Sequence, residues 1–171
     1  FRFGLDLGVE WKGIDFSMFW QGVAKRDLWL DGPMFWGISG GEWQSTGLKE
    51  HLDYYRPENT TSVFGPNTNA YFPKMYMSKD MNQKVQTRYL QNGAYARLKN
   101  IQLGYTFPTQ IINKLHMQKL RVYVSAENVL TITSLPSGFD PETTYSSYSD
   151  GNSGKTYPLQ TTISFGLHAT F

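Results

Sequence analysis

The sequence predicts an all-β protein, an antiparallel segment of a transmembrane β-barrel. Three observations predict this class: apolar and polar residues alternate in five segments, the chain closes on an aromatic residue, and long and short connections alternate. The alternation is clearest in 159–171, where one parity carries Ile163, Phe165 and Leu167 and the other carries polar residues or glycine. Because successive strand side chains point to opposite faces, this segment forms a strand with one apolar face. It is long enough to cross a bilayer, which takes about 9–11 tilted residues.

The composition limits the classes of function. The chain has 171 residues, a formal net charge of +2, no cysteine and an aromatic fraction of 16%. The near-balanced charge gives no support for nucleic-acid binding or for a polybasic membrane-surface segment, and without cysteine there is neither disulfide nor thiol chemistry. The mean hydropathy of −0.44 and the lack of an apolar run of about 18 residues predict no transmembrane helix. Barrel strands are only half apolar, so these values stay compatible with a membrane-spanning barrel.

Four further segments alternate in the same way. The predicted strands cover about 1–11, 14–24, 94–107, 120–131 and 159–171. The first two form a hairpin, because Lys12 and Gly13 leave room only for a tight turn, in which glycine adopts a positive φ readily. In 94–107, Arg97 and Lys99 fall on the apolar parity. Either a β-bulge resets the register there, or the two cations lie at the level of the lipid headgroups.

The connections divide into two long and two short ones. Residues 25–93 and 132–157 are rich in turn-forming and polar residues, whereas 12–13 and 108–119 are brief. Bacterial barrels have short periplasmic turns and long extracellular loops, so we expect the two long connections to be extracellular. A soluble sandwich offers no reason for such regular alternation. A short helix is expected over 46–55, within the first long connection.

The strand count predicts that the chain is a piece of a longer polypeptide. A closed single-chain barrel needs an even number of strands, eight or more, and five is odd and too few. An open sheet in lipid would leave two edges of unpaired backbone groups, each of which costs several kcal/mol. Phe1 also lies within the alternating pattern already. We therefore expect strands outside this chain to complete the barrel.

The sequence shows no pattern of catalytic, cofactor-binding or metal-binding residues. His51, His116 and His168 are scattered without the spacing of metal ligands, and a structural or solvated role fits each of them. The polar segment 150–154 resembles the start of a calcium loop but lacks the distal glutamate that completes one. No nucleophile elbow accompanies the serines. We expect no enzyme, no metal and no cofactor.

Aromatic residues crowd the first long connection and are the candidate contact residues. Aromatic rings stack on sugars and anchor protein interfaces, but a long loop also packs on itself through its aromatic residues, and both interpretations stay open. The candidates for contact with a ligand or a partner protein are Trp29, Trp36, Trp43, Tyr54 and Tyr55. On the polar parity of the strands, charges of both signs predict salt bridges along the barrel wall. These charged residues are Arg2, Asp6, Glu10, Asp15, Arg121 and Glu127.

Five sequence blocks carry a family resemblance. They are NGAYARLKNIQLGYTFP from Asn92 to Pro108, LRVYVSAENVLT from Leu120 to Thr131, GFDPE from Gly138 to Glu142, Tyr157-Pro158, and ISFGLHATF from Ile163 to Phe171. In order and spacing these blocks resemble the C-terminal part of SusC/RagA-type TonB-dependent outer-membrane transporters. The resemblance covers about 94–171 well and 1–24 more loosely, whereas 25–93 is variable in that family.

The resemblance implies a twenty-two-stranded outer-membrane barrel of the Bacteroidota, of which this chain would form the last five strands, with lipid against its apolar face. It implies import of glycans, or in some members peptides, with a SusD-like surface lipoprotein as lid. It also implies that TonB supplies energy through a plug domain that, like the remaining strands, lies outside this chain. Coupling to TonB cannot be inferred from these residues. Two alternatives stay open: a passive porin with the same kind of barrel, and a soluble all-β binding module.

Overall fold

The computed structural model describes residues 1–37, 47–76, 82–144 and 154–171. The chain divides into two compact units, and each is described by itself. The sheet unit comprises Phe1–Arg26, Asn92–Ser134 and Leu159–Phe171, and the loop unit comprises Asp27–Gln91 and Leu135–Pro158. Apart from a few residues at their ends, the two segments of the loop unit are the two long connections seen in the sequence.

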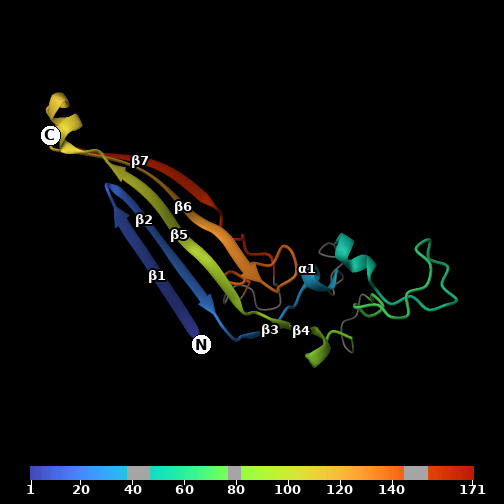
Figure 1. Ribbon diagram of the computed structural model, residues 1–171. Coiled ribbons are helices and arrows are strands. Elements are labelled where there is room, and N and C mark those ends of the chain that lie inside the picture. Colours follow the sequence, from blue (N-terminus) through green and yellow to red (C-terminus); the bar gives the residue numbers. More distant parts are fainter. Residues whose placement is uncertain (38–46, 77–81, 145–153) are drawn as a thin grey trace. The chain divides into compact units, whose positions relative to one another are not determined.

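The sheet unit is a five-stranded antiparallel sheet in the order β1-β2-β5-β6-β7 (Figure 1). Its strands are β1 (Arg2–Trp11), β2 (Ile14–Val23), β5 (Tyr95–Thr106), β6 (Lys119–Thr133) and β7 (Thr162–Thr170). Each strand pairs with the next of these five along the chain, so the sheet is a meander. The antiparallel all-β class predicted from the alternation is confirmed. Within this chain, β1 and β7 are the edges of the sheet.

The observed strand ends differ by a few residues from the predicted ones, mostly in β6 and β7. β6 continues to Thr133, because this residue still pairs with Tyr95 at the start of β5. β7 begins only at Thr162, since the preceding residues bond to an irregular part of β6. There, Asn128 Nδ2 donates to the Gln160 carbonyl oxygen at 3.2 Å. Asn128 has a φ of 52°, which takes its backbone out of the regular ladder.

The β1–β2 hairpin is closed by the two residues that the sequence predicts for its turn. Lys12 and Gly13 have φ values of 48° and 87°, and two consecutive positive φ values are what a type I′ turn requires. The turn contacts the end of β5, where the Thr106 N–H donates to the Gly13 carbonyl oxygen at 2.7 Å. A Cβ on Gly13 would lie 2.7 Å from the Thr106 carbonyl oxygen, so space as well as conformation requires glycine here.

A β-bulge in β5 interrupts the alternation at Lys99. Pairing with β2 passes directly from Asn100 to Leu98, so Lys99 is the extra residue. The bulge shifts the parity of the strand by one, and Arg97 therefore lies opposite Gln21 on the polar face. Of the two explanations that the sequence left open for the misplaced cations, the register shift is the one observed.

The register aligns the apolar residues into rows that cross all five strands. One row reads Val9, Phe16, Leu103, Val124 and Phe165. A neighbouring row on the opposite face reads Glu10, Asp15, Gly104, Tyr123 and Gly166. The apolar face is open in this chain, as the exposed fractions of Leu103 (49%) and Phe165 (84%) show. The sheet therefore has one apolar and one polar face across its whole width.

The remaining elements are short. In the sheet unit, α2 (Thr109–Ile112) and η4 (Asn113–Leu115) connect β5 to β6. In the loop unit, β3 (Asp27–Trp29) pairs with β4 (Leu90–Asn92), and the helical turns are α1 (Pro33–Trp36), η2 (Lys49–Leu52) and η3 (Thr87–Tyr89). No helix among the described residues has the length and apolar character needed to cross a bilayer.

The helix predicted over 46–55 is wrong in length and in type, because only the 3₁₀ helix η2 forms there and residue 46 lies outside the described residues. The helix ends at Leu52, since Asp53 bends the chain and Tyr54 forms a bridge with Phe72. The Phe72 N–H donates to the Asp53 carbonyl oxygen, and the Tyr55 N–H donates to that of Phe72, both at 3.0 Å. A contact distant in sequence thus overrides the local helical pattern.

Candidate functional site

An aromatic cluster forms the core of the loop unit. Its buried members are Leu30, Phe35, Trp36, Phe72 and Tyr89, and Trp29, Tyr54, Tyr71 and Phe139 pack against them. Trp36 is only 2% exposed, and its ring centroid lies 4.8 Å from that of Tyr89 and 5.0 Å from that of Phe35, in edge-to-face contacts. This is a favoured geometry of aromatic pairs. Burial in the cluster raises the pKa of the Tyr89 phenol above its ordinary value.

The structure separates the predicted contact residues by their exposure. Trp36 is in the core, and the half-buried Trp29 has its ring centroid 5.8 Å from that of Trp36, so both pack within the loop unit. Tyr54 is also half-buried against the cluster. Tyr55 is 40% exposed, and Trp43 lies outside the described residues. Contact with a ligand or partner stays a prediction, and Tyr55 is the described candidate with the most free surface.

The chain that follows η2 forms a closed loop held by side chains that bond to its backbone. Asp53 lies at the base, where its Oδ1 accepts from Asn67 Nδ2 at 2.8 Å and its Oδ2 accepts from the Tyr71 N–H at 3.2 Å. The buried Arg56 spans the loop, since its Nε donates to the Gly65 carbonyl oxygen at 2.6 Å. A loop that is ordered in this way loses less conformational entropy when it binds a partner.

His51 is buried at the edge of the aromatic cluster and has no free ring nitrogen. Its Nδ1 accepts from the Leu48 N–H at 2.9 Å, and its Nε2 lies 2.9 Å from the Phe35 carbonyl oxygen. Because Nδ1 is an acceptor, the proton is on Nε2, which donates to that carbonyl. His51 thus has the structural role that the sequence suggested. Among the described residues, no group of three or more His, Asp or Glu side chains could hold a metal ion.

A groove of about 490 Å³ opens beside the aromatic cluster, lined only by residues of the loop unit. Its volume falls in the range of small-ligand pockets, about 300–1,000 Å³. Residues that line it include Phe35, Glu50, Tyr71, Phe72, Gln91 and Phe139. Sequence reasoning missed this site, because its lining comes from segments far apart in the chain and no spacing pattern connects them.

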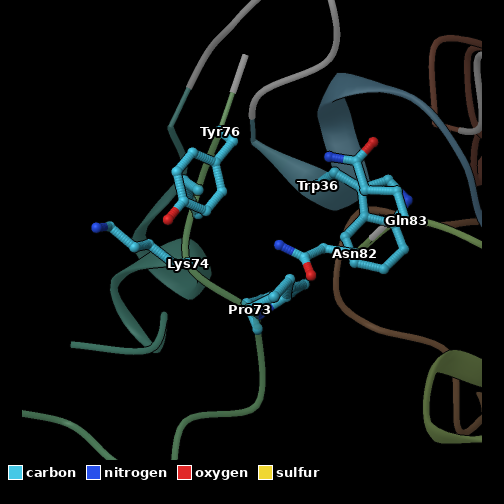
Figure 2. A pocket seen from close by; sticks show the side chains of 8 residues that line it. Trp36, Pro73, Lys74, Tyr76, Asn82 and Gln83 are labelled. Atoms are coloured by element: carbon cyan, nitrogen blue, oxygen red, sulfur yellow. The ribbon is translucent and has the colours of Figure 1, made fainter. Parts of the chain in front are cut away.

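A second space in the loop unit is much smaller. Figure 2 shows the side chains that line it, among them Trp36, Pro73, Tyr76 and Asn82. Its volume is about 10 Å³, roughly the least that holds a single water molecule. The groove, and not this space, is therefore the candidate for binding a ligand.

On the polar face of the sheet, an ion pair joins two members of the predicted charged set. Arg121 of β6 donates to Asp15 of β2, with 2.9 Å between Nε and Oδ2. Gly104 of β5 lies between these strands, and a Cβ on it would overlap the Asp15 carboxylate. The Arg121 guanidinium carbon also lies 4.9 Å from the centroid of the Tyr123 ring. The glycine thus allows two strands that are not neighbours to share one ion pair.

The known proteins that the chain matches are much longer than the chain itself. No family model matches the chain. It is 27% identical over 178 residues to TonB-dependent receptor P3 of Formosa agariphila, and 25% identical over 175 residues to TonB-dependent receptor P26 of the same bacterium. These alignments cover 100% and 99% of this chain but only 16% and 17% of the relatives. The chain thus spans about one sixth of the length of the curated relatives that it matches.

Solved structures of a related importer share the fold. The structure of the RagAB peptide importer in its "closed-closed" state matches with a TM-score of 0.66 and 25% identity, over 99% of this chain and 17% of that chain. The "open-open" state matches with a TM-score of 0.63 at 22% identity, which shows the fold alone. The resemblance to SusC/RagA-type TonB-dependent transporters that the sequence blocks predict is confirmed. The proteins that it matches are receptors and importers, not enzymes.

Proposed function

We propose that this chain is part of the wall and of the outer loops of a TonB-dependent outer-membrane importer. The importer takes up glycans or peptides together with a SusD-like surface lipoprotein. The observation that carries the proposal is the apolar face of the five-stranded sheet, with rows of apolar residues in register from β1 to β7. The TonB-dependent receptors and the peptide importer that resemble the chain support it.

Lipid is the environment that suits the apolar face of the sheet. Apolar surface left in water costs about 25 cal/mol per Å², and the exposed side chains of the apolar rows include Leu5, Val9, Leu103, Ile163 and Phe165. In hydrocarbon these side chains are at no disadvantage. The unpaired backbone groups of β1 and β7 are unfavourable in hydrocarbon, because each unsatisfied group costs several kcal/mol there. Both edges therefore pair with further strands of the same barrel, and the family resemblance implies twenty-two strands in all.

The loop unit lies on the extracellular side in this proposal. Its two segments connect β2 to β5 and β6 to β7. Both connections therefore start at the end of the strands that is opposite the Lys12–Gly13 turn. Their irregular backbone is not tolerated in contact with hydrocarbon. Long outer loops and short periplasmic turns are the rule in bacterial barrels. There the loop unit can meet the lipoprotein and the substrate, whereas plug and TonB act through parts of the protein outside this chain.

The first test is to place a charge on the apolar face. Phe165→Arg in the full-length protein should destabilise the folded barrel by about 2–4 kcal/mol, the cost of arginine facing lipid near the midplane. Ser164→Arg is the matched control, since Ser164 lies on the polar face of the same strand. Heat-modified mobility on gels and outer-membrane protein level measure the effect. If the two variants behave alike, the sheet does not face lipid and the soluble binding module is favoured.

The second test separates an importer from a passive porin. Uptake of the native nutrient should stop when TonB is deleted or when the proton-motive force is collapsed, because an importer depends on energy delivered through TonB. Uptake that continues unchanged under both treatments contradicts the importer and favours the porin. Co-purification of a surface lipoprotein with the tagged full-length protein tests the proposed partner.

A further inference from the structure

The groove of the loop unit has aromatic walls that are fixed in place. Phe35 and Phe72 are buried, whereas Tyr71 and Phe139 are half-buried and keep part of their ring surface free. Edge-to-face contacts hold the half-buried rings: Tyr71 to Phe72 with 4.9 Å between centroids, and Phe139 to Phe35 with 6.2 Å. Such walls attract the apolar stem of a long side chain, and the faces of the rings attract cations.

The charge of the groove has one sign. Its described lining contains Glu50 and Asp53 but no lysine or arginine. Both oxygens of Asp53 accept hydrogen bonds within the loop unit, and both ring nitrogens of His51 are used as well. Glu50 is exposed, and the described residues give it no ion-pair partner. The groove therefore repels anions and offers one carboxylate that a ligand can neutralise.

The polar groups of the lining are mainly acceptors. The Gln91 Nε2 donates to Tyr71 Oη at 2.9 Å and to the Tyr89 carbonyl oxygen at 2.7 Å, which leaves its Oε1 for a ligand. The Glu50 carboxylate only accepts. A guanidinium or ammonium group, which has several donors and no acceptor, matches this inventory. A sugar hydroxyl matches it less well, since each hydroxyl is both donor and acceptor and, among the lining side chains, only the hydroxyls of Tyr71 and Ser137 are left to donate.

We propose that the groove binds the basic side chain of a peptide that carries arginine or lysine. The stem and the charged group of that side chain lie against the half-buried rings of Tyr71 and Phe139, and the charged group meets the Glu50 carboxylate. The inference rests on the proposed import function, and it narrows the substrate from glycans or peptides to basic peptides. The complementary charge of the groove is the observation that selects this occupant over an oligosaccharide.

The test compares two synthetic probes on the purified full-length protein that contains this chain. The probes are a heptapeptide of alanine with one central arginine and the same peptide with glutamine in place of arginine. We expect the arginine peptide to bind about tenfold more tightly in calorimetry, as one charge-assisted contact provides. Equal affinity for the two peptides, or no binding of either, overturns the inference.

Substitutions in the groove test whether the preference for the arginine peptide arises there. Glu50→Gln should lower the affinity for the arginine peptide about tenfold and leave the glutamine peptide unchanged. Glu58→Gln is the matched control, because Glu58 is an exposed glutamate of the same unit that does not line the groove. Phe139→Leu keeps apolar bulk but removes the ring face, and should weaken the arginine peptide about threefold. If Glu50→Gln weakens both peptides equally, or matches Glu58→Gln, the groove does not recognise the basic group.

An oligosaccharide probe separates this inference from the broader proposal. If Phe139→Leu lowers binding of maltoheptaose and leaves the arginine peptide unaffected, the groove binds sugar, and only the substrate assignment fails. Uptake of the native nutrient that still depends on TonB then leaves the import function intact. If uptake does not depend on TonB at all, the import function itself fails, whichever probe the groove prefers.

Discussion

The sheet unit and the loop unit use apolar side chains in opposite ways. In the sheet unit, the row that contains Val9, Leu103 and Phe165 is exposed on one face, and order comes from backbone pairing between strands in register. In the loop unit, Phe35 and Trp36 are buried, and order comes from ring packing together with side chains that bond to the backbone. The same abundance of aromatic residues thus serves an outer surface in one unit and a core in the other.

This difference indicates which substitutions each unit tolerates. A sheet with a ladder of backbone hydrogen bonds can lose a single exposed side chain with little damage, but it cannot accept a wrong charge on its apolar face or a bulky residue where strands approach closely. A loop unit without such a ladder depends on a few central side chains. Substitutions in the two units should therefore differ in the free energy of unfolding that they cost and in how much of the chain they destabilise.

The largest effect is expected at the centre of the aromatic cluster. Trp36→Ala should destabilise the loop unit by about 3–5 kcal/mol, as is usual for a buried large aromatic residue replaced by alanine. Tyr55→Ala, at an exposed position of the same unit, should cost far less. Limited proteolysis and hydrogen exchange of the full-length protein would show whether only 27–91 and 135–158 open. Equal loss of protection in the sheet unit would contradict the separation of the two units.

A smaller effect is expected where a glycine allows close contact in the sheet. A Cβ on Gly22 of β2 would overlap the Tyr95 carbonyl oxygen and the Phe3 ring, so Gly22→Ala should cost about 1–3 kcal/mol of overpacking. In β1, Gly8→Ala meets nothing closer than 3.9 Å and serves as control. Chemical unfolding in detergent measures both. If the control is as destabilised as Gly22→Ala, close contact with Tyr95 and Phe3 does not explain the cost.

The smallest effect is expected at the ion pair on the polar face. Asp15→Asn removes the charge that Arg121 bonds, and both side chains are partly exposed, at 24% and 20%. Exposed ion pairs contribute about 0.2–1 kcal/mol, so the folded sheet should lose no more than that, and less at high salt. Asp6→Asn, on the same face, is the control. A loss well above this range would show that the pair is shielded from solvent by parts of the protein outside this chain.

Much of the sheet unit could be predicted because the patterns that specify it lie among residues close together in the sequence. Alternation at period two is visible residue by residue, and the dipeptide Lys12-Gly13 carries its own turn chemistry. Even the bulge left a trace in the sequence, since Arg97 and Lys99 fall on the wrong parity. The loop unit offered no such period. Its aromatic composition was compatible with contact and with self-packing alike, and the two could be told apart only by seeing which rings meet.

By itself, the sequence determined the antiparallel class, the approximate extent of five strands, the hairpin turn and the family resemblance. Each of these depends on neighbours along the chain or on short motifs. Only the tertiary structure decided the register that aligns Phe16 with Leu103, the sharing of one ion pair across Gly104, the burial of Trp36 and the groove around Glu50. These depend on which distant segments come together. A local pattern of side chains sets the parity of a strand, but it does not identify the distant residue that each position meets.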